Sequence, residues 1–437
     1  MPAQTLRGEV THLLQELIRL DTVNPPGNET RAAELLRDYL EPSGVSCDFY
    51  ARAPERANLV ARIPGSGDGP RLLLLSHTDT VLADPAEWTV DPWSGELRDG
   101  HVWGRGALDM KGQAAASAVA IASLAREGFR PRGDLIFAAT ADEEVGDDPD
   151  FGLSWLCREH PEAVRAEYAV NEGAGDRVEV GGHAFYLCAT SEKMSSPFVL
   201  RVHGRSGHAS LPSIADNALV KAAGYIERVA ELAPEPQLIP EVEVLLEAVC
   251  GDVPAAADAL AAARAVDPAA AVLVEPLLSP TLSPTMITAS NKRNVIPALT
   301  EVTVDCRLLP GQTQEEVETL LRGWLGDGDY EIAWRTGQGG TRSAMATPLW
   351  SAAETFIAEA EPGARVLPMC VAGFTDSHWL REAFGTVAYG FFPVRSMDPY
   401  LAARLVHSAD ERADVDDLEL GVRWLRHAAL AIAGSDG

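Results

Sequence analysis

The chain contains few cysteines and no long apolar run, and each absence narrows the class of protein. Its six cysteines are scattered without a C-x-x-C pair, so neither a disulfide framework nor a thiolate zinc site is expected. No apolar run approaches the ~20 residues that a membrane span needs, and the first residues lack the charged and then apolar pattern of a signal peptide. We therefore expect a soluble, cytoplasmic protein with no membrane partner.

Basic residues are also scarce. Lysine and arginine total 36 against 64 aspartates and glutamates, which gives a formal net charge of −28. Nucleic acids and anionic membrane surfaces would repel such a chain, so we exclude both as partners. With 437 residues, of which 46% are hydrophobic, the chain is long enough for two domains with real cores.

Two kinds of strand pattern alternate along the chain. Residues 72–75 are four consecutive leucines, which is typical of a strand buried on both faces between helices, and similar apolar runs occur at 135–140, 168–170 and 386–390. Between them, residues 198–203 alternate apolar and polar side chains and open a βαββαβ series. We therefore predict an α/β fold with a mixed, mostly parallel sheet and helices on both faces. It forms a split catalytic domain at 1–193 and 339–437, with an α+β domain inserted at 194–338 and an Ala-rich helical stretch at 255–272.

Residues with metal-binding side chains follow several of the apolar runs. Because the carboxyl ends of parallel strands meet at one edge of a sheet, these side chains are expected to converge. Two divalent ions need a bridging carboxylate and further His, Asp or Glu ligands. Singly, each residue could be structural or a solvated loop charge, and Asp109 could simply cap a helix. Together they predict one metal site, with the candidates His77, Asp79, Asp109, Glu143, Glu144 and Glu172.

Ordered motifs along the chain resemble a known family. They are SHTDTV at 76–81, W-x-x-D-P-W-S-G-x-L-x-D-G-H-V-W-G-R-G-A-L-D-M-K-G at 88–112, ADEEVG at 141–146, GRSGHASLP at 204–212 and a late HSADE at 407–411. The set resembles the dinuclear zinc exopeptidase and deacylase family, which includes aminoacylase, glutamate carboxypeptidase, acetylornithine deacetylase and succinyl-diaminopimelate desuccinylase. The resemblance implies a hydrolase that cleaves a peptide or N-acyl amide bond next to a free carboxylate. Its substrate would be a short peptide or an N-acyl amino acid.

The resemblance also implies roles for the site residues. His77 and Glu172 would bind one metal ion, Glu144 and His407 would bind the other, and Asp109 would bridge the two. Asp79 would orient His77, and Glu143 would be the general base that deprotonates a metal-bridging water. We expect two divalent ions per subunit, with Zn²⁺ as the first choice and Co²⁺ or Mn²⁺ as alternatives, because His and carboxylate ligands suit all three.

The inserted domain supplies further candidates. From its spacing alone His208 is a surface histidine, whereas the resemblance implies that it stabilises the oxyanion, commonly in the active site of a dimer partner. By the same resemblance Asn294 and Arg307 contact the substrate carboxylate, Thr375 lies in a loop that touches substrate, and the inserted domain acts as a lid and homodimer interface. On its strand Arg307 shares the polar face with Asp305, which could instead be its ion-pair partner.

A function of another class is a catalytically silent relative that acts as a metal-free binding or regulatory protein. The intact set of candidate ligands argues against this alternative. A binding module also has no use for a general base such as Glu143.

Overall fold

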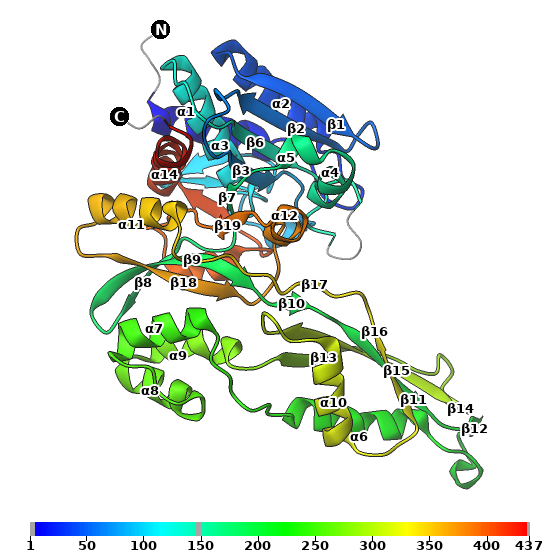
Figure 1. Cartoon of the computed structure of the whole chain (residues 1–437). Coiled ribbons are helices and arrows are strands. Elements are labelled where there is room, and N and C mark those ends of the chain that lie inside the picture. Colours follow the sequence, from blue (N-terminus) through cyan, green and yellow to red (C-terminus); the bar gives the residue numbers. More distant parts are fainter. Residues whose placement is uncertain (1–4, 146–149, 435–437) are drawn as a thin grey trace. The chain divides into compact units, whose positions relative to one another are not determined.

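The computed structural model describes residues 5–145 and 150–434 and divides into two compact units (Figure 1). Unit 1 comprises Met1–Thr190, Ser343–Met369 and Thr375–Gly437, and unit 2 comprises Ser191–Arg342 and Cys370–Phe374. Within the described ranges, no helix is both long and apolar enough to cross a membrane.

A large mixed sheet forms the centre of unit 1. Its strands lie in the order β1 (Ser46–Ala51), β2 (Ala57–Ile63), β6 (Leu135–Thr140), β3 (Leu72–His77), β7 (Tyr168–Asn171), β19 (Val387–Gly390), β9 (His183–Glu192) and β18 (Arg365–Val371), with β8 (Arg177–Val180) paired to β9. The four strands β6, β3, β7 and β19 run parallel, while β1, β2 and β9 pair antiparallel with their neighbours. The predicted α/β class with a mixed sheet is confirmed.

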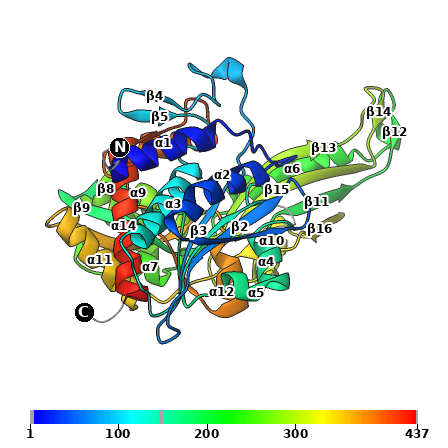
Figure 2. The same cartoon turned by 90° about the horizontal axis from the view of Figure 1, so that it is seen from above.

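Helices cover both faces of this sheet. One face packs against α1 (Leu6–Ile18), α2 (Thr30–Leu40), α3 (Lys111–Arg126), α11 (Pro348–Ala360) and α14 (Val415–Ala433), several of which lie over the strands in Figure 2. The other face packs against α4 (Leu153–Glu159), α5 (Pro161–Val164) and α12 (Ser377–Phe384). Unit 1 also contains α13 (Pro399–Leu405) and a small sheet of β4 (Glu96–Arg98), β5 (His101–Trp103) and β20 (Arg412–Asp414).

The leucine strand β3 shows why this arrangement is stable. Leu72 and Leu74 belong to the core on the α3 side, whereas Leu73 and Leu75 belong to the core on the α4 side. All four side chains are at most 1% exposed, as expected for a central parallel strand whose alternate residues point to opposite faces. The strand therefore holds its last residue, His77, on a rigid support.

Unit 2 is an α+β module. Its antiparallel sheet contains β16 (Tyr330–Trp334), β11 (Phe198–His203), β15 (Leu299–Leu308), β10 (Met194–Ser195) and β17 (Gln338–Gly339), with β13 (Thr281–Thr288) paired to β15. Alternate apolar residues of β11 and β15 pack against α6 (Ala218–Glu231) and α10 (Gln314–Leu325). A small ribbon joins β12 (Gly207–His208) to β14 (Val295–Ile296), and the helices α7 (Pro240–Cys250), α8 (Ala259–Val266) and α9 (Pro268–Val274) complete the unit.

Candidate functional site

Candidate metal ligands from distant parts of unit 1 meet at one edge of its sheet. His77 is the last residue of β3, where it pairs with Thr140 at the end of the parallel strand β6. Glu143 and Glu144 follow β6, and Glu172 directly follows β7. A loop before α3 and a segment after α13 bring the last two candidates, Asp109 and His407, to the same place. This convergence is the arrangement expected at the carboxyl ends of parallel strands.

Asp109 lies between two histidines. Its Oδ1 is 3.0 Å from His77 Nε2, and its Oδ2 is 3.0 Å from His407 Nε2. Each histidine also faces a glutamate, with 3.7 Å from His77 Nε2 to Glu172 Oε2 and 3.2 Å from His407 Nε2 to Glu144 Oε2. One carboxylate thus presents its two oxygens to two separate His–Glu pairs, which is the geometry of a bridging ligand.

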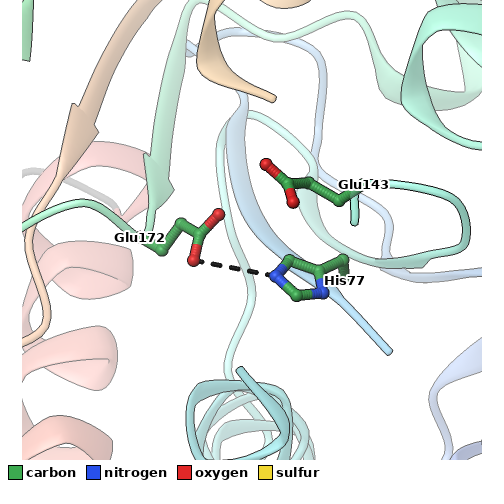
Figure 3. Close-up of side chains that lie close together, drawn as sticks. All are labelled: His77, Glu143 and Glu172. Carbon is green, nitrogen blue, oxygen red and sulfur yellow. Dashed lines mark ion pairs between the residues drawn. The ribbon is translucent and has the colours of Figure 1, made fainter. Parts of the chain in front are cut away.

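Glu143 faces the same space as the His77–Glu172 pair. Figure 3 shows its carboxylate opposite the imidazole ring, with the Glu172 carboxylate also turned toward that ring. One ligand atom from each of the three residues lies within 4.8 Å of the others, and His77, Asp109 and Glu144 form a second group of this kind. By distance alone, Glu143 could be a ligand or a base beside one.

The donor set fits divalent cations. Two atoms bound to one zinc at about 2.0–2.2 Å in a tetrahedron are about 3.3–3.6 Å apart, within the range of the observed His–carboxylate separations of 3.0–3.7 Å. Within the described residues, Glu144 Oε1 is buried without a hydrogen-bond partner, which is costly unless a cation compensates it. Imidazole and carboxylate ligands suit zinc, cobalt and manganese alike. The site can therefore hold divalent metal.

The pKa shifts of the site residues also indicate that the site favours positive charge among its carboxylates. Burial raises the pKa of Glu143, Glu144 and Glu172, since each charged form is desolvated beside other acids. Hydrogen bonds to Asp109 and Glu144 raise the pKa of His407 to about 10. The pKa of Asp109 is lowered, because its bonds to His407 and His77 outweigh its desolvation. In the metal-free chain a protonated His407 therefore compensates part of the negative charge of Asp109 and Glu144.

Asp79 anchors the loop that carries the two adjacent glutamates. Its carboxylate accepts hydrogen bonds from the backbone N–H groups of Glu143 at 3.3 Å and Glu144 at 3.0 Å. The His77 Nδ1 lies 3.1 Å from the Asp79 backbone carbonyl and 3.5 Å from its carboxylate. The residue therefore contacts His77, as its predicted orienting role requires, and it also fixes the two glutamates that diverge from this loop.

A buried polar network behind Asp79 was not predicted from the sequence. Asn24 Nδ2 donates to Asp79 Oδ2 at 2.9 Å and to Asp142 Oδ1 at 3.1 Å. Arg56 donates to Asp142 at 2.7 Å and forms a two-pronged ion pair with the buried Glu29. In the sequence Asn24 is followed by two prolines, which indicate a break in regular structure but say nothing about its side chain. The network supports the active-site loop from behind.

Glu411 organises the loop that carries Asp109. Its fully buried carboxylate accepts hydrogen bonds from the backbone N–H groups of Gly106, Leu108 and Asp109 at 2.7–3.1 Å, and from Arg105 Nη1 at 2.6 Å. Glu411 lies four residues after His407, so it joins the bridging loop to the His407 segment. The late HSADE motif contained this residue, but its spacing gave no role for the final glutamate.

The loop after β18 adds another buried acid to unit 1. Burial raises the pKa of Asp376 to about 8, and the charges of Glu172 and Asp79 act in the same direction. The predicted substrate contact Thr375 is 7% exposed, and its hydroxyl accepts from Ser377 N. The buried His378 is held through its Nδ1 by the Thr375 carbonyl at 2.7 Å. Asp376 is the member of this loop with an electrostatic link to the candidate ligands.

The other predicted contacts belong to unit 2. His208 is exposed and its Nδ1 lies 2.7 Å from Ser210 Oγ. Arg307 forms a two-pronged ion pair with Asp305 at 3.0 Å, the alternative partner that its strand position indicated. Asn294 is exposed before β14. Their roles toward substrate stay predictions.

Metal affinity should rise with pH. In the metal-free protein the raised pKa keeps His407 protonated at neutral pH, and a metal ion binds only the neutral ring, so binding must displace a proton. Below a pKa of about 10, each displaced proton makes the apparent affinity rise about tenfold per pH unit. Calorimetric titration with Zn²⁺ at pH 6, 7 and 8, in buffers of different ionisation enthalpy, measures both effects. A pH-independent affinity without proton release would contradict this assignment.

Replacing Glu411 should lower the free energy of unfolding, because this residue anchors the loop that carries Asp109. Glu411→Gln leaves the buried Arg105 without its counter-charge and turns an amide toward backbone N–H groups, so we expect a loss of about 3–5 kcal/mol in unfolding free energy. The exposed Glu96 provides a control, since Glu96→Gln should stay within about 0.5 kcal/mol of wild type. Urea unfolding of the metal-free proteins measures the difference. Equal unfolding curves for the two variants would show that Glu411 does not organise the loop.

Comparisons with known proteins agree with this architecture. The model of peptidase family M20/M25/M40 matches residues 73–431. A succinyl-diaminopimelate desuccinylase of Cereibacter sphaeroides is 30% identical over 423 residues, with 93% of this chain and 94% of that protein covered. Among solved structures, an M20 metallo-carboxypeptidase of Sulfolobus solfataricus has a TM-score of 0.74 at 17% identity, covering 97% of this chain and 99% of that one. Human carnosine dipeptidase 1 has a TM-score of 0.68 at 16% identity, covering 98% and 97%. The chain therefore belongs to peptidase family M20/M25/M40 and is a hydrolase.

Proposed function

We propose that this protein is a dinuclear metallohydrolase, with zinc as the expected ion, that cleaves the peptide or N-acyl amide bond of a small substrate next to a free carboxylate. The main support for this proposal is the position of Asp109, whose two carboxylate oxygens each lie 3.0 Å from a different histidine. The substrates named for the relatives, a succinylated amino acid and dipeptides, fall in the same class of short amides.

In this proposal His77 and Glu172 hold one ion, His407 and Glu144 hold the other, and Asp109 is shared. When bound, the ions supply Lewis acidity, which polarises the scissile carbonyl and makes water a better nucleophile. The chain's own contribution is then to keep these ligands in place and to move a proton.

Glu143 is the residue proposed to move that proton. In the metal-free chain burial raises its pKa above the ordinary carboxyl value. A carboxylate that faces the ligands without being needed as one is suited to accept a proton and release it again. Its carboxylate would take a proton from the attacking water and deliver it to the departing amine. Glu144, one residue on, already lies 3.2 Å from His407, so the two glutamates can have different roles.

Replacing each of the two glutamates in turn by glutamine tests this division of roles between base and ligand. Glu143→Gln should lower kcat by a factor of about 10² or more, the order expected for losing a general base, while metal content stays at the wild-type level. Glu144→Gln removes a ligand and should lower the metal content itself. Kinetics on a short-peptide and N-acyl-amino-acid panel, with metal analysis of each variant, separates the outcomes. If Glu143→Gln loses metal and Glu144→Gln keeps it, the two roles are reversed.

We also propose that the protein is a homodimer formed through unit 2. Large apolar side chains of this unit are open to solvent, among them Val220 at 68%, Met286 at 66% and Ile287 at 50% exposure. Met286 and Ile287 lie on β13, which pairs with β15 alone within the described residues. An exposed apolar edge strand invites pairing with another chain. A dimer would also allow His208 to serve the partner's site.

Charge placed on the edge strand should separate the subunits. Ile287→Lys should convert the dimer to a monomer in light scattering, whereas Val272→Lys is a matched control, since Val272 is 58% exposed on α9, away from that strand. Mixing inactive His208→Ala and Glu143→Gln chains should restore part of the activity, because one site of each mixed dimer has both residues. A fully active monomer would contradict both the dimer and the role of His208 in trans.

A further inference from the structure

A cavity of about 310 Å³ lies beside the candidate metal centre, entirely within unit 1. Its walls are mainly apolar and include Leu108, Phe392, Val394, Met397 and Val406. This volume and lining are typical of a small-ligand pocket rather than of packing defects in a core.

The cavity shares residues with the metal centre. Asp109, the carboxylate between the two histidines, and Glu172, which faces His77, both line it. A substrate whose carbonyl reaches these ligands could therefore extend an attached side arm into the cavity. An apolar wall favours the methylene groups of such an arm.

Most of the other polar side chains of the cavity have protein partners. Gln113 donates to the Leu75 carbonyl at 3.3 Å. Asp414 caps α14 by accepting from Asp416 N at 2.8 Å, and Asp417 accepts from the backbone N–H groups of residues 395–397 at 2.8–3.0 Å. These groups shape the chain around the cavity and leave little capacity for a ligand.

Asp176 is different. Within the described residues, no side chain forms a hydrogen bond or ion pair with its carboxylate, which accepts from its own backbone N–H and is repelled by the negative charge of Asp417, another residue of the cavity wall. The neighbouring Arg177 is turned to Glu361, with 2.8 Å between Nε and Oε1. Burial raises the pKa of Asp176 to about 6, so the group is largely ionised at neutral pH without a counter-charge. A partly buried, unpaired carboxylate is unfavourable until a cation reaches it.

The backbone holds Asp176 firmly at the cavity. Its carbonyl accepts from Leu187 N at 3.1 Å, and it forms a parallel bridge with Val394, itself a wall residue. The carboxylate is thus presented by a rigid sheet margin rather than by a loose surface loop, as a recognition group requires.

We propose that this cavity binds an aliphatic substrate arm that ends in a protonated amine, as in a lysine or ornithine side chain, with Asp176 as the carboxylate that receives the ammonium group. The inference rests on the proposed function, and it assigns the arm to the acyl side of the scissile bond. Methylene groups pack on Phe392 and Met397, and the ammonium group forms a charge-assisted hydrogen bond.

Two dipeptides that differ only in the terminal ammonium group test the proposal. Metal-loaded wild-type enzyme should cleave lysyl-alanine with a kcat/KM at least tenfold above that of norleucyl-alanine. Asp176→Asn should reduce this ratio to near one by lowering the lysyl value alone. Glu179→Gln is the matched control, because Glu179 lies on the adjacent β8 with a side chain 64% exposed, and its ratio should equal that of wild type.

A binding measurement separates failure of this inference from failure of the proposed function. Calorimetry should detect n-pentylammonium, but not n-pentanol, binding to wild-type protein, and binding should be lost in Asp176→Asn. Turnover of both dipeptides at equal kcat/KM, with no ammonium binding, overturns the cavity assignment and leaves the hydrolase intact. Absence of turnover of any short amide, with ammonium binding preserved, would instead overturn the proposed substrate class.

Discussion

Carboxylates gathered at one sheet edge repel each other unless positive charge lies among them. Asp109, Glu143, Glu144 and Glu172 meet in this way, and burial raises the pKa of the three glutamates. In the metal-free chain the histidines supply part of the compensation by holding protons, as the high pKa of His407 shows. Divalent cations would replace those protons. The acids that make the site unfavourable when empty are the ones that make it suited to metal.

The fold keeps these acids together through two buried anchors. Asp79 accepts from the backbone of both adjacent glutamates, and Asn24 holds Asp79 in turn. Glu411 accepts from the backbone of the Asp109 loop and pairs with Arg105. Each anchor is a carboxylate that binds backbone N–H groups, so both fix main chain rather than side chains alone. Ligand positions are thereby set before any ion binds.

Much of this arrangement follows from local sequence patterns. The four leucines at 72–75, followed closely by His77, predicted a buried strand with a polar residue at its carboxyl end. The structure contains this strand as β3. The acids after the other apolar runs were expected at the same edge because parallel strands align their ends. The residues that support the site could not be predicted from the sequence, because only the fold brings Asn24, Arg56 and Asp142 together. Asp176 gave no signal for the same reason, because the sequence does not show that its carboxylate lacks a side-chain partner among the described residues.

In the proposed metal centre Asp109 is shared by two metal ions. Anomalous diffraction from crystals of the zinc-loaded protein tests it most directly. We expect two peaks, separated by about 3.5–4 Å, one beside His77 and Glu172 and the other beside His407 and Glu144, with one oxygen of Asp109 directed to each. A single fully occupied peak at zinc saturation, or two peaks without Asp109 between them, would contradict it.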